Sequence, residues 1–212
     1  MRVLVFGSTG PTGREVCLQA VSRGHAASAF ARTPSKLANV SGLTSTFSGD
    51  VLDATAVSSA IRSATPDAIL VSLGGASIWG RDYVCSRGTE NILAAVRAAN
   101  LSPRIVVCTS MGVGDSADKI PGFVRWMLKH ALADKEPQEA AVRSSGFPFA
   151  IVRPMGLRDT PARGAAAITA REAAALPTSA ISRADVAGFM LDCLTSDTWL
   201  GKTVGIAWTQ KE

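Results

Sequence analysis

Residue types that bind metals or carry redox chemistry are scarce in this chain of 212 residues, which has only two histidines and four cysteines. The cysteines are Cys17, Cys85, Cys108 and Cys193. They form no CxxC pair, and neither histidine lies near a cysteine pair in sequence, so we expect no metal site. Three of them lie in apolar periodic segments, where a reduced thiol behaves as a small hydrophobic group, and we expect buried free thiols.

Long hydrophobic runs are also missing from the sequence. Arg, Asp or Gly interrupts every apolar stretch before it reaches the roughly 18 residues that are needed to span a bilayer. The apolar run at residues 1–6 ends at Gly7, which makes it too short for the hydrophobic region of a secretion signal. These absences predict a cytoplasmic protein with no membrane association.

Aromatic residues make up only 6% of the chain, and Tyr83 is its single tyrosine. Lys and Arg residues are spread along the sequence rather than clustered with aromatic side chains, which argues against nucleic-acid binding. The formal net charge of +5 nevertheless favours an anionic partner. A nucleotide cofactor is sufficient to meet that expectation.

The sequence does contain a regular alternation of strand-length apolar runs and amphipathic helical segments, which is typical of βαβ units. We expect strands at residues 3–6, 26–31, 43–48, 68–73, 104–108, 149–152 and 203–207. We expect helices at residues 13–22, 54–64, 87–100, 123–132, 136–145 and 186–194. Pro137 suits the first turn of the fifth helix, and Ser182 with Asp185 forms a capping box before the last. The pattern predicts a single α/β domain over residues 1–212, with a doubly wound parallel sheet and helices on both faces.

The first expected strand leads directly into a glycine-rich turn and then a helix. The turn consists of Gly7, Ser8, Thr9, Gly10, Pro11, Thr12 and Gly13. Gly7 permits the tight turn, Gly10 lets a phosphate approach the backbone, and Gly13 lets the helix pack close to the sheet. The helix N-terminus supplies N–H groups to an anion. Although its GxxGxxG spacing differs from the usual GxGxxG, the position of the turn predicts the dinucleotide-binding loop of a Rossmann fold.

The residues after the second expected strand favour NADPH over NADH. An acidic residue there would hold the adenosine ribose of NAD, but this chain has Arg32, followed by Ser35 and Lys36, and no carboxylate. A guanidinium, a hydroxyl and an ammonium suit the additional phosphate of NADP. The alternative is that Arg32 and Lys36 are solvated charges in a loop.

Two later strand ends complete the expected cleft, because open α/β sheets bind ligands beyond the carboxyl ends of their strands. Asp50 and Val51 follow the third strand, where we expect the adenine. Leu73, Gly74 and Gly75 follow the fourth strand, where we expect the central phosphates or the nicotinamide ribose.

Several motifs together resemble the atypical short-chain dehydrogenase/reductase family. They are GSTGPTG at 7–13, the Arg32 loop, GDVLDA at 49–54, CTS at 108–110, IVRP at 151–154 and ISRADVAGFML at 181–191. Within that family the chain resembles the NAD(P)H-binding proteins related to flavin reductase, also called biliverdin IXβ reductase, and more loosely the NmrA-type proteins. The resemblance covers nearly the whole chain.

The resemblance implies hydride transfer from NADPH to a conjugated aromatic acceptor such as a free flavin, a bilin or a quinone. It places Ser110 at the end of the fifth strand beside nicotinamide and substrate, as the catalytic residue, and it places Thr109 and Pro154 at the cofactor. A hydroxyl there can donate a hydrogen bond where negative charge develops on the substrate, although Ser110 could also simply cap a turn. Substrate-side elements are expected within residues 153–180, and Trp79 either stacks on the acceptor or covers the domain edge.

The chain also departs from the family pattern. The YxxxK pair of ordinary members is missing, because the residue four before Lys135 is Ala131, which cannot transfer a proton. The histidine that flavin reductases tend to carry after strand six is also absent. Classical alcohol dehydrogenation is therefore disfavoured, whereas reduction of a conjugated acceptor can take its proton from solvent.

Two other functional classes remain. The missing tyrosine keeps open an NADP(H)-binding redox sensor or scaffold, similar to NmrA-type proteins, that turns nothing over. An isomerase or epimerase of nucleotide-linked sugars needs the same tyrosine and a larger C-terminal region, so it is less favoured. The flavin reductases that the chain resembles are monomers, and we expect a monomer here. The sequence leaves open the physiological acceptor, the proton donor and whether turnover occurs.

Overall fold

A computed structural model describes residues 1–74, 83–168 and 180–208 of the chain. The strands are β1 Arg2–Phe6, β2 Ala26–Ala31, β3 Ser45–Ser48, β4 Ala68–Val71, β5 Arg104–Cys108, β6 Phe149–Pro154, β7 Gly156–Arg158, β8 Ala166–Ile168, β9 Ala180–Ser182 and β10 Lys202–Ala207. The helices are α1 Pro11–Ser22, α2 Ala54–Ala64, α3 Val84–Ala98, α4 Gly122–Met127, α5 Lys129–Arg143 and α7 Arg183–Thr195. Short 3-10 turns lie at Pro34–Leu37, Gly114–Lys119 and Asp197–Trp199.

The central sheet of the described residues has eight strands in the order β3-β2-β1-β4-β5-β6-β10-β8. All neighbours pair in parallel except β8, which lies antiparallel to β10 at the edge. The strand order reverses at β1, which has β2 on one side and β4 on the other. This is the doubly wound Rossmann arrangement that the alternating pattern predicted, and ligands bind at such a reversal.

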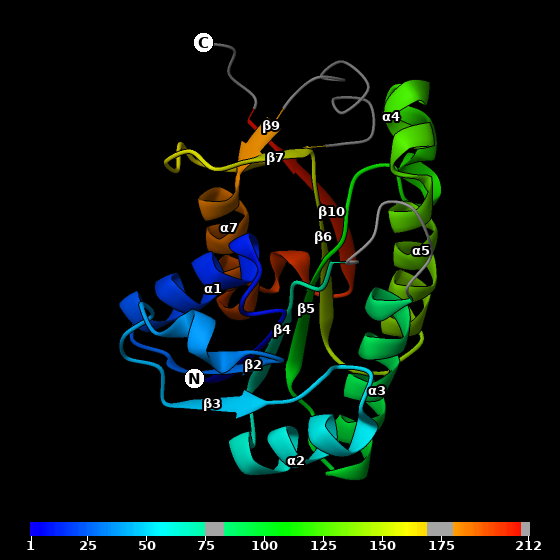
Figure 1. The fold of residues 1–212 in the computed structure, drawn as a ribbon. Coiled ribbons are helices and arrows are strands. Elements are labelled where there is room, and N and C mark those ends of the chain that lie inside the picture. The colour runs from blue at the N-terminus through cyan, green and yellow to red at the C-terminus, as the bar shows by residue number, and fades with distance from the viewer. Residues whose placement is uncertain (75–82, 169–179, 209–212) are drawn as a thin grey trace.

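Helices cover both faces of the sheet (Figure 1). Along β1, Val3 and Val5 face a core formed with α1 and α7, whereas Leu4 and Phe6 face a core formed with α2, α3 and α5. This alternation follows from the two-residue period of a strand. Each fully buried side chain of this size stabilises the fold by about 1.5–3 kcal/mol, so the two cores hold β1 firmly under the glycine turn.

A second, two-stranded ladder lies beside the main sheet, above α7 in Figure 1. It pairs β7 with β9 in parallel, and β9 leads directly into α7. The sequence did not predict β7, β8 or β9, because each has only three residues and offers too little periodicity.

The prediction that a helix starts at residue 136 was wrong. The structure instead has one helix, α5, from Lys129 to Arg143 with Pro137 inside it, preceded by the short α4. A proline within a helix removes one backbone hydrogen bond and introduces a steric conflict. Buried contacts from Asp134 and Glu139 on either side of Pro137 hold the helix together across that defect.

None of the helices in the described ranges is long and apolar enough to cross a bilayer. Within the same ranges, no cluster of three or more His, Cys, Asp or Glu side chains is arranged to hold a metal ion. The four cysteines are free and buried, as expected, and burial raises the pKa of Cys17 and of Cys193 to about 12.

Candidate functional site

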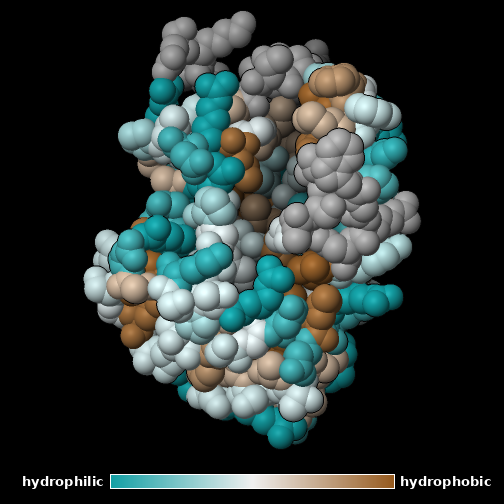
Figure 2. All heavy atoms as spheres, in the orientation of Figure 1, coloured by the Kyte–Doolittle hydropathy of each residue, from teal (hydrophilic) through white to brown (hydrophobic). Residues whose placement is uncertain are grey.

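A cavity of about 570 Å³ opens where the strand order reverses, beyond the carboxyl ends of β1, β4 and β5. The glycine turn and the end of β2 line one part of it, and residues of α5 line another. Figure 2 shows the recess between the side that carries α7 and β9 and the side that carries α4 and α5. The cavity therefore lies where the topology predicts a dinucleotide site.

The glycine turn has the geometry of a phosphate-binding loop. Gly7 has a φ of +77°, and a Cβ on it would lie 2.3 Å from the Ser72 carbonyl oxygen. A Cβ on Gly13 would lie 2.1 Å from the Gly7 carbonyl oxygen, so α1 can approach β1 only with glycine there. Gly10 is the N-cap of α1 and provides no side-chain cap, which leaves N–H groups of the first helical turn available to an anion. These residues fit the pyrophosphate of a dinucleotide.

The residues predicted in this turn fall into two groups. Gly7, Thr9, Gly10, Pro11 and Thr12 line the cavity, whereas Ser8 and Gly13 do not.

Ser8 is fully buried, and its hydroxyl donates to the Phe30 carbonyl at 2.9 Å, which ties the turn to β2. Gly13 acts through the close approach of α1. Both therefore shape the turn from behind the cavity wall.

At the end of the cavity predicted to hold adenosine, Arg32, Asp50 and Val51 line the wall. Ser35 and Lys36 are exposed in the 3-10 turn after β2 and are not among the lining residues. The Asp50 carboxylate accepts the Leu52 N–H at 2.9 Å and so shapes its own turn. Of the basic residues predicted at the 2′-phosphate, the structure places Arg32 at the cavity.

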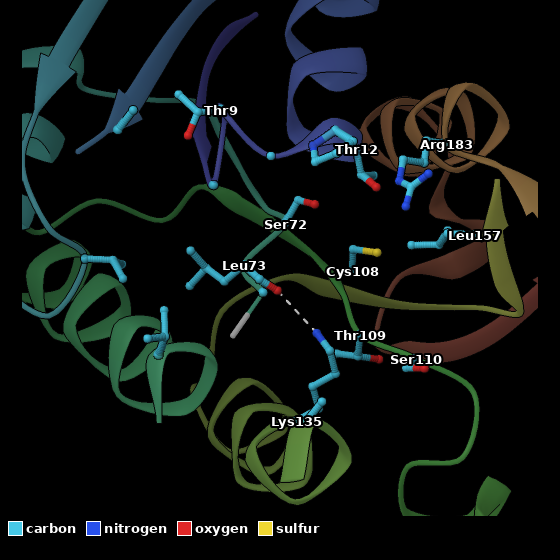
Figure 3. A pocket seen from close by; sticks show the side chains of 18 of the residues that line it. Thr9, Thr12, Ser72, Leu73, Cys108, Thr109, Ser110, Lys135, Leu157 and Arg183 are labelled. Atoms are coloured by element: carbon cyan, nitrogen blue, oxygen red, sulfur yellow. Dashed lines mark hydrogen bonds between the residues drawn. The ribbon is translucent and has the colours of Figure 1, made fainter. Parts of the chain in front are cut away.

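The opposite end of the cavity is formed by Leu73 and Gly74 after β4, by Thr109 and Ser110 after β5, and by α5. Lys135 extends from α5 and donates to the Leu73 carbonyl at 3.3 Å (Figure 3). Gly75 and Trp79, also predicted here, lie outside the described residues.

Ala131, one turn before Lys135, lines the cavity too. The lysine is thus present, but the position of the missing tyrosine is occupied by a methyl group.

The hydroxyl groups after β5 already have acceptors. Ser110 Oγ donates to the Met111 carbonyl at 2.9 Å, and Thr109 Oγ1 donates to Glu139 at 2.7 Å. Pro154 does not line the cavity, but its carbonyl accepts the Met111 N–H at 3.0 Å. A small rotation would free the Ser110 hydroxyl for a ligand, whereas the Thr109 hydroxyl is held from behind by a buried carboxylate.

Cys108 also lines the cavity, directly before these two residues (Figure 3). Burial raises the pKa of its thiol, and the nearby Lys135 ammonium only partly opposes that effect. Because the thiolate is the reactive form of cysteine, this environment favours an inert neutral thiol.

A buried ion pair supports the end of β5. The guanidinium of Arg153 binds both carboxylate oxygens of Glu139, with distances of 2.9 and 2.7 Å. These side chains are 5% and 1% exposed, and Arg153 also contacts Asp115. Burial pushes the pKa of Glu139 up, but Arg153 and the Thr109 hydroxyl outweigh it, so the net pKa lies below its usual value. Glu139 is therefore ionised and fixed.

Asp134 provides a second buried carboxylate on α5. It accepts the backbone N–H of Cys85 at 2.7 Å and of Ser86 at 3.1 Å, at the start of α3. A carboxylate at a helix N-terminus is favourable because of the unpaired N–H groups there. Asp134 thus anchors the start of α3, and the adjacent Lys135 contacts the end of β4.

The first turn of α7 organises the predicted substrate side. The Ser182 hydroxyl caps the helix by accepting the Asp185 N–H at 2.9 Å, as the capping box predicted. The Asp185 carboxylate also accepts the Gly164 N–H at 2.8 Å and the Trp208 Nε1–H at 2.7 Å. Burial raises the pKa of Asp185, but the Ser182 hydroxyl, which donates to its Oδ2 atom at 2.7 Å, and the N–H donors outweigh that effect and lower the net pKa. The motif therefore holds the preceding loop as well as the helix.

Two residues that form or support the cavity were not identified from the sequence. Arg183 lines the cavity from the start of α7. The sequence feature that could have identified it is its position directly after a helix cap, at the carboxyl edge of the sheet. Glu139 was missed as a support, although an arginine inside the apolar strand that contains Arg153 requires a buried acidic partner.

Comparison with known protein families finds one match that spans most of the chain. The model of a family described as NAD(P)H-binding matches residues 7–197. The match includes the glycine turn, both sides of the cavity and the whole of α7.

Solved structures with the same fold include several oxidoreductases. ChuY, an anaerobilin reductase from Escherichia coli O157:H7, has a TM-score of 0.81 and 24% identity, covering 99% of this chain and 98% of that chain. The oxidoreductase ylbE from Lactococcus lactis has a TM-score of 0.82 and 17% identity, covering 97% and 90%. A short-chain dehydrogenase/reductase from Veillonella parvula DSM 2008 in complex with NADP has a TM-score of 0.76 and 11% identity, covering 97% and 94%.

Proposed function

This chain belongs to the NAD(P)H-binding family, and we propose that it is an NADPH-dependent reductase of a conjugated acceptor such as a free flavin, a bilin or a quinone. The observation that carries the proposal is one continuous cavity with Arg32 and the glycine turn at one end and Ser110 and Lys135 at the other. The fold shared with ChuY, an anaerobilin reductase, supports a bilin among the candidate acceptors.

The proposed cofactor residues follow the length of the cavity. Arg32 would bind the 2′-phosphate, and the N-terminus of α1 at Thr12 would bind the pyrophosphate. Leu73 and Lys135 would contact the nicotinamide ribose. When bound, NADPH supplies a hydride, so the acceptor has to lie beside Cys108 and Ser110.

The protein's own contribution at the acceptor is hydrogen bonding and access to water. Ser110 would turn its hydroxyl from the Met111 carbonyl and donate to the acceptor atom on which negative charge develops. With Ala131 in the tyrosine position, no phenol is among the described residues that line the cavity, and the proton would come from water. A conjugated acceptor suits this arrangement because it spreads the added charge.

A second candidate function is an NADP(H)-binding sensor or scaffold without turnover. The observation that favours it is the same alanine, since the cavity retains the lysine of the dehydrogenase pair but lacks its proton donor. In this case the cofactor residues keep their roles, and Ser110 has none. We further propose that the protein works as a cytoplasmic monomer, which sedimentation velocity tests for the oligomeric state.

The deciding experiment mixes the purified protein with NADPH and free FMN and follows the absorbance of the reduced nicotinamide. Controls omit the protein or replace NADPH with NADH. Protein-dependent oxidation of NADPH supports the reductase, and bilins and quinones are then tested as acceptors. If calorimetry detects NADPH binding but no acceptor promotes oxidation, the sensor is the better interpretation.

A further inference from the structure

Arg183 is a cation that lines the cavity from the start of α7. It is the first residue of α7, directly after the capping residue Ser182, and it follows a strand that pairs with β7. Its guanidinium extends from α7 toward the part of the cavity where Thr12 and Leu157 lie (Figure 3). The side chain is only 22% exposed, so it belongs to the cavity wall rather than to the outer surface.

The ion pair that Arg183 makes is open to exchange. Its Nη1 atom lies 2.7 Å from Asp159 Oδ1, and the Asp159 side chain is 78% exposed. A pair with one partner in water is weak, because solvent screens the attraction and hydrates the carboxylate when it leaves. A guanidinium has five N–H donors arranged to bind an oxyanion with two parallel hydrogen bonds. A ligand oxyanion inside the cavity can therefore displace Asp159.

The charges around the cavity favour an anionic ligand. Among the described lining residues, the cations are Arg32, Lys135 and Arg183, and the single carboxylate is Asp50. Asp50 and Arg32 both lie at the end of the cavity where adenosine is expected, after β3 and β2. Two of the cations, Lys135 and Arg183, thus lie away from this carboxylate, and the N-terminus of α1 at Thr12, close to Arg183 in Figure 3, adds further positive potential.

We propose that Arg183 binds an oxyanion of a reactant in the cavity and that Asp159 occupies the guanidinium when no reactant is present. The oxyanion belongs either to a cofactor phosphate or to a carboxylate on the acceptor. This inference rests on the proposed function only for the identity of the ligands. It does not require turnover, because measurements of ligand binding alone test it.

Two substitutions with opposite effects provide the test. Arg183→Gln removes the cation and is expected to weaken ligand binding roughly tenfold or more, the typical value of a hydrogen bond to a charged group. Asp159→Asn removes the competing carboxylate and is expected to tighten binding by up to about fivefold. In the double variant the gain from Asp159→Asn disappears, because its effect acts only through Arg183. Arg158→Gln is the matched control, since this neighbouring exposed arginine does not line the cavity.

Two titrations by calorimetry identify the source of the oxyanion. The first measures the dissociation constant of NADPH for each variant. The second adds a naphthoquinone with a carboxylate side chain, or its uncharged amide, to protein saturated with NADP. Circular dichroism melting curves confirm that the variants are folded.

A weaker NADPH complex in Arg183→Gln assigns the site to a cofactor phosphate. Loss of preference for the carboxylate over the amide assigns it to the acceptor. If both dissociation constants stay within twofold of the wild type in Arg183→Gln, or if Arg158→Gln has the same effect, the proposal is overturned. Failure of the reductase proposal would instead appear as absence of NADPH oxidation in the wild type, which leaves these titrations readable.

Discussion

The Arg153 guanidinium binds both carboxylate oxygens of Glu139 inside the protein and thereby joins β6 to α5. Glu139 also accepts the hydroxyl of Thr109, the residue that precedes Ser110 at the cavity. The end of β5 is thus held from behind by a charged pair that does not line the cavity.

Glu139→Gln is expected to lower the free energy of unfolding by about 3–5 kcal/mol, because it leaves the buried charge of Arg153 poorly compensated. Urea unfolding followed by circular dichroism measures the change. Glu136→Gln, on the exposed face of the same helix, is the control and should change stability by less than about 0.5 kcal/mol. Equal effects of both substitutions would contradict the role given to Glu139.

Stability is expected to fall in acid because the pKa values of Glu139 and Asp185 are lowered in the folded protein. Below the usual values of 4.5 and 3.8, the unfolded chain binds more protons than the folded one, so stability rises with pH there. The contribution is complete above these values and is lost as the pH falls through the folded pKa values. Melting temperatures between pH 2.5 and 7 should show a shallower acid decline in Glu139→Gln; an unchanged slope argues against this origin.

Gly13→Ala is expected to abolish tight cofactor binding and to destabilise the fold by about 1–3 kcal/mol or more. Its Cβ would lie 2.1 Å from the Gly7 carbonyl oxygen, so either α1 or the glycine turn has to move. Thermal melting and NADPH calorimetry measure the two effects. Gly122→Ala, where an added Cβ has no atom within 4 Å, should leave both unchanged. A normally binding Gly13→Ala would refute the close-approach argument.

Arg32→Gln is expected to weaken NADPH binding roughly tenfold or more while leaving NADH binding nearly unchanged, since it removes a charged hydrogen bond to the 2′-phosphate. Titration with both nucleotides measures the ratio of dissociation constants. Lys36→Gln is the comparison, and its effect should be smaller because Lys36 does not line the cavity. Equal affinities of the wild type for NADPH and NADH would already defeat the assignment.

Ser110→Ala is expected to lower kcat by roughly 10²-fold if the hydroxyl stabilises charge on the acceptor. NADPH affinity should change little, because the proposed partner of this hydroxyl is the acceptor and not the cofactor. Without a ligand, the hydroxyl donates to the Met111 carbonyl. Steady-state kinetics with a flavin or quinone, combined with NADPH titration, separate the two effects. An unchanged kcat would leave Ser110 with only the turn-capping role.

Much of the fold could be predicted from the sequence because its signals are local. The glycines of the first turn, the apolar strands and the capping box at Ser182 each report on a few adjacent residues. The alternation of strands and helices then allows few topologies other than the doubly wound sheet. The same reasoning located Arg32, Asp50 and Leu73 at strand ends, where the structure places the cavity.

What could not be predicted depends on contacts between distant segments. Nothing next to Pro137 in sequence shows that Asp134 binds the start of α3 or that Glu139 binds Arg153, and these contacts keep the helix intact around the proline. Arg183 reaches the cavity only because β9 and α7 bring a late segment beside the first glycine turn.

The interior face of α5 also bears on the order in which the chain assembles. Asp134 binds the start of α3, Lys135 the end of β4, Gln138 the Thr89 hydroxyl, and Glu139 both Thr109 and β6. Any shift of the helix along its axis would break these contacts together and leave polar groups unpaired, at about 1–3 kcal/mol each. Because β6 follows α5 in the chain, a ribosome has to release that strand before the helix has its complete set of partners. Until β6 is available, docking of α5 would leave the buried Glu139 carboxylate without its partner Arg153, so we expect the helix to dock completely only after β6 has been made.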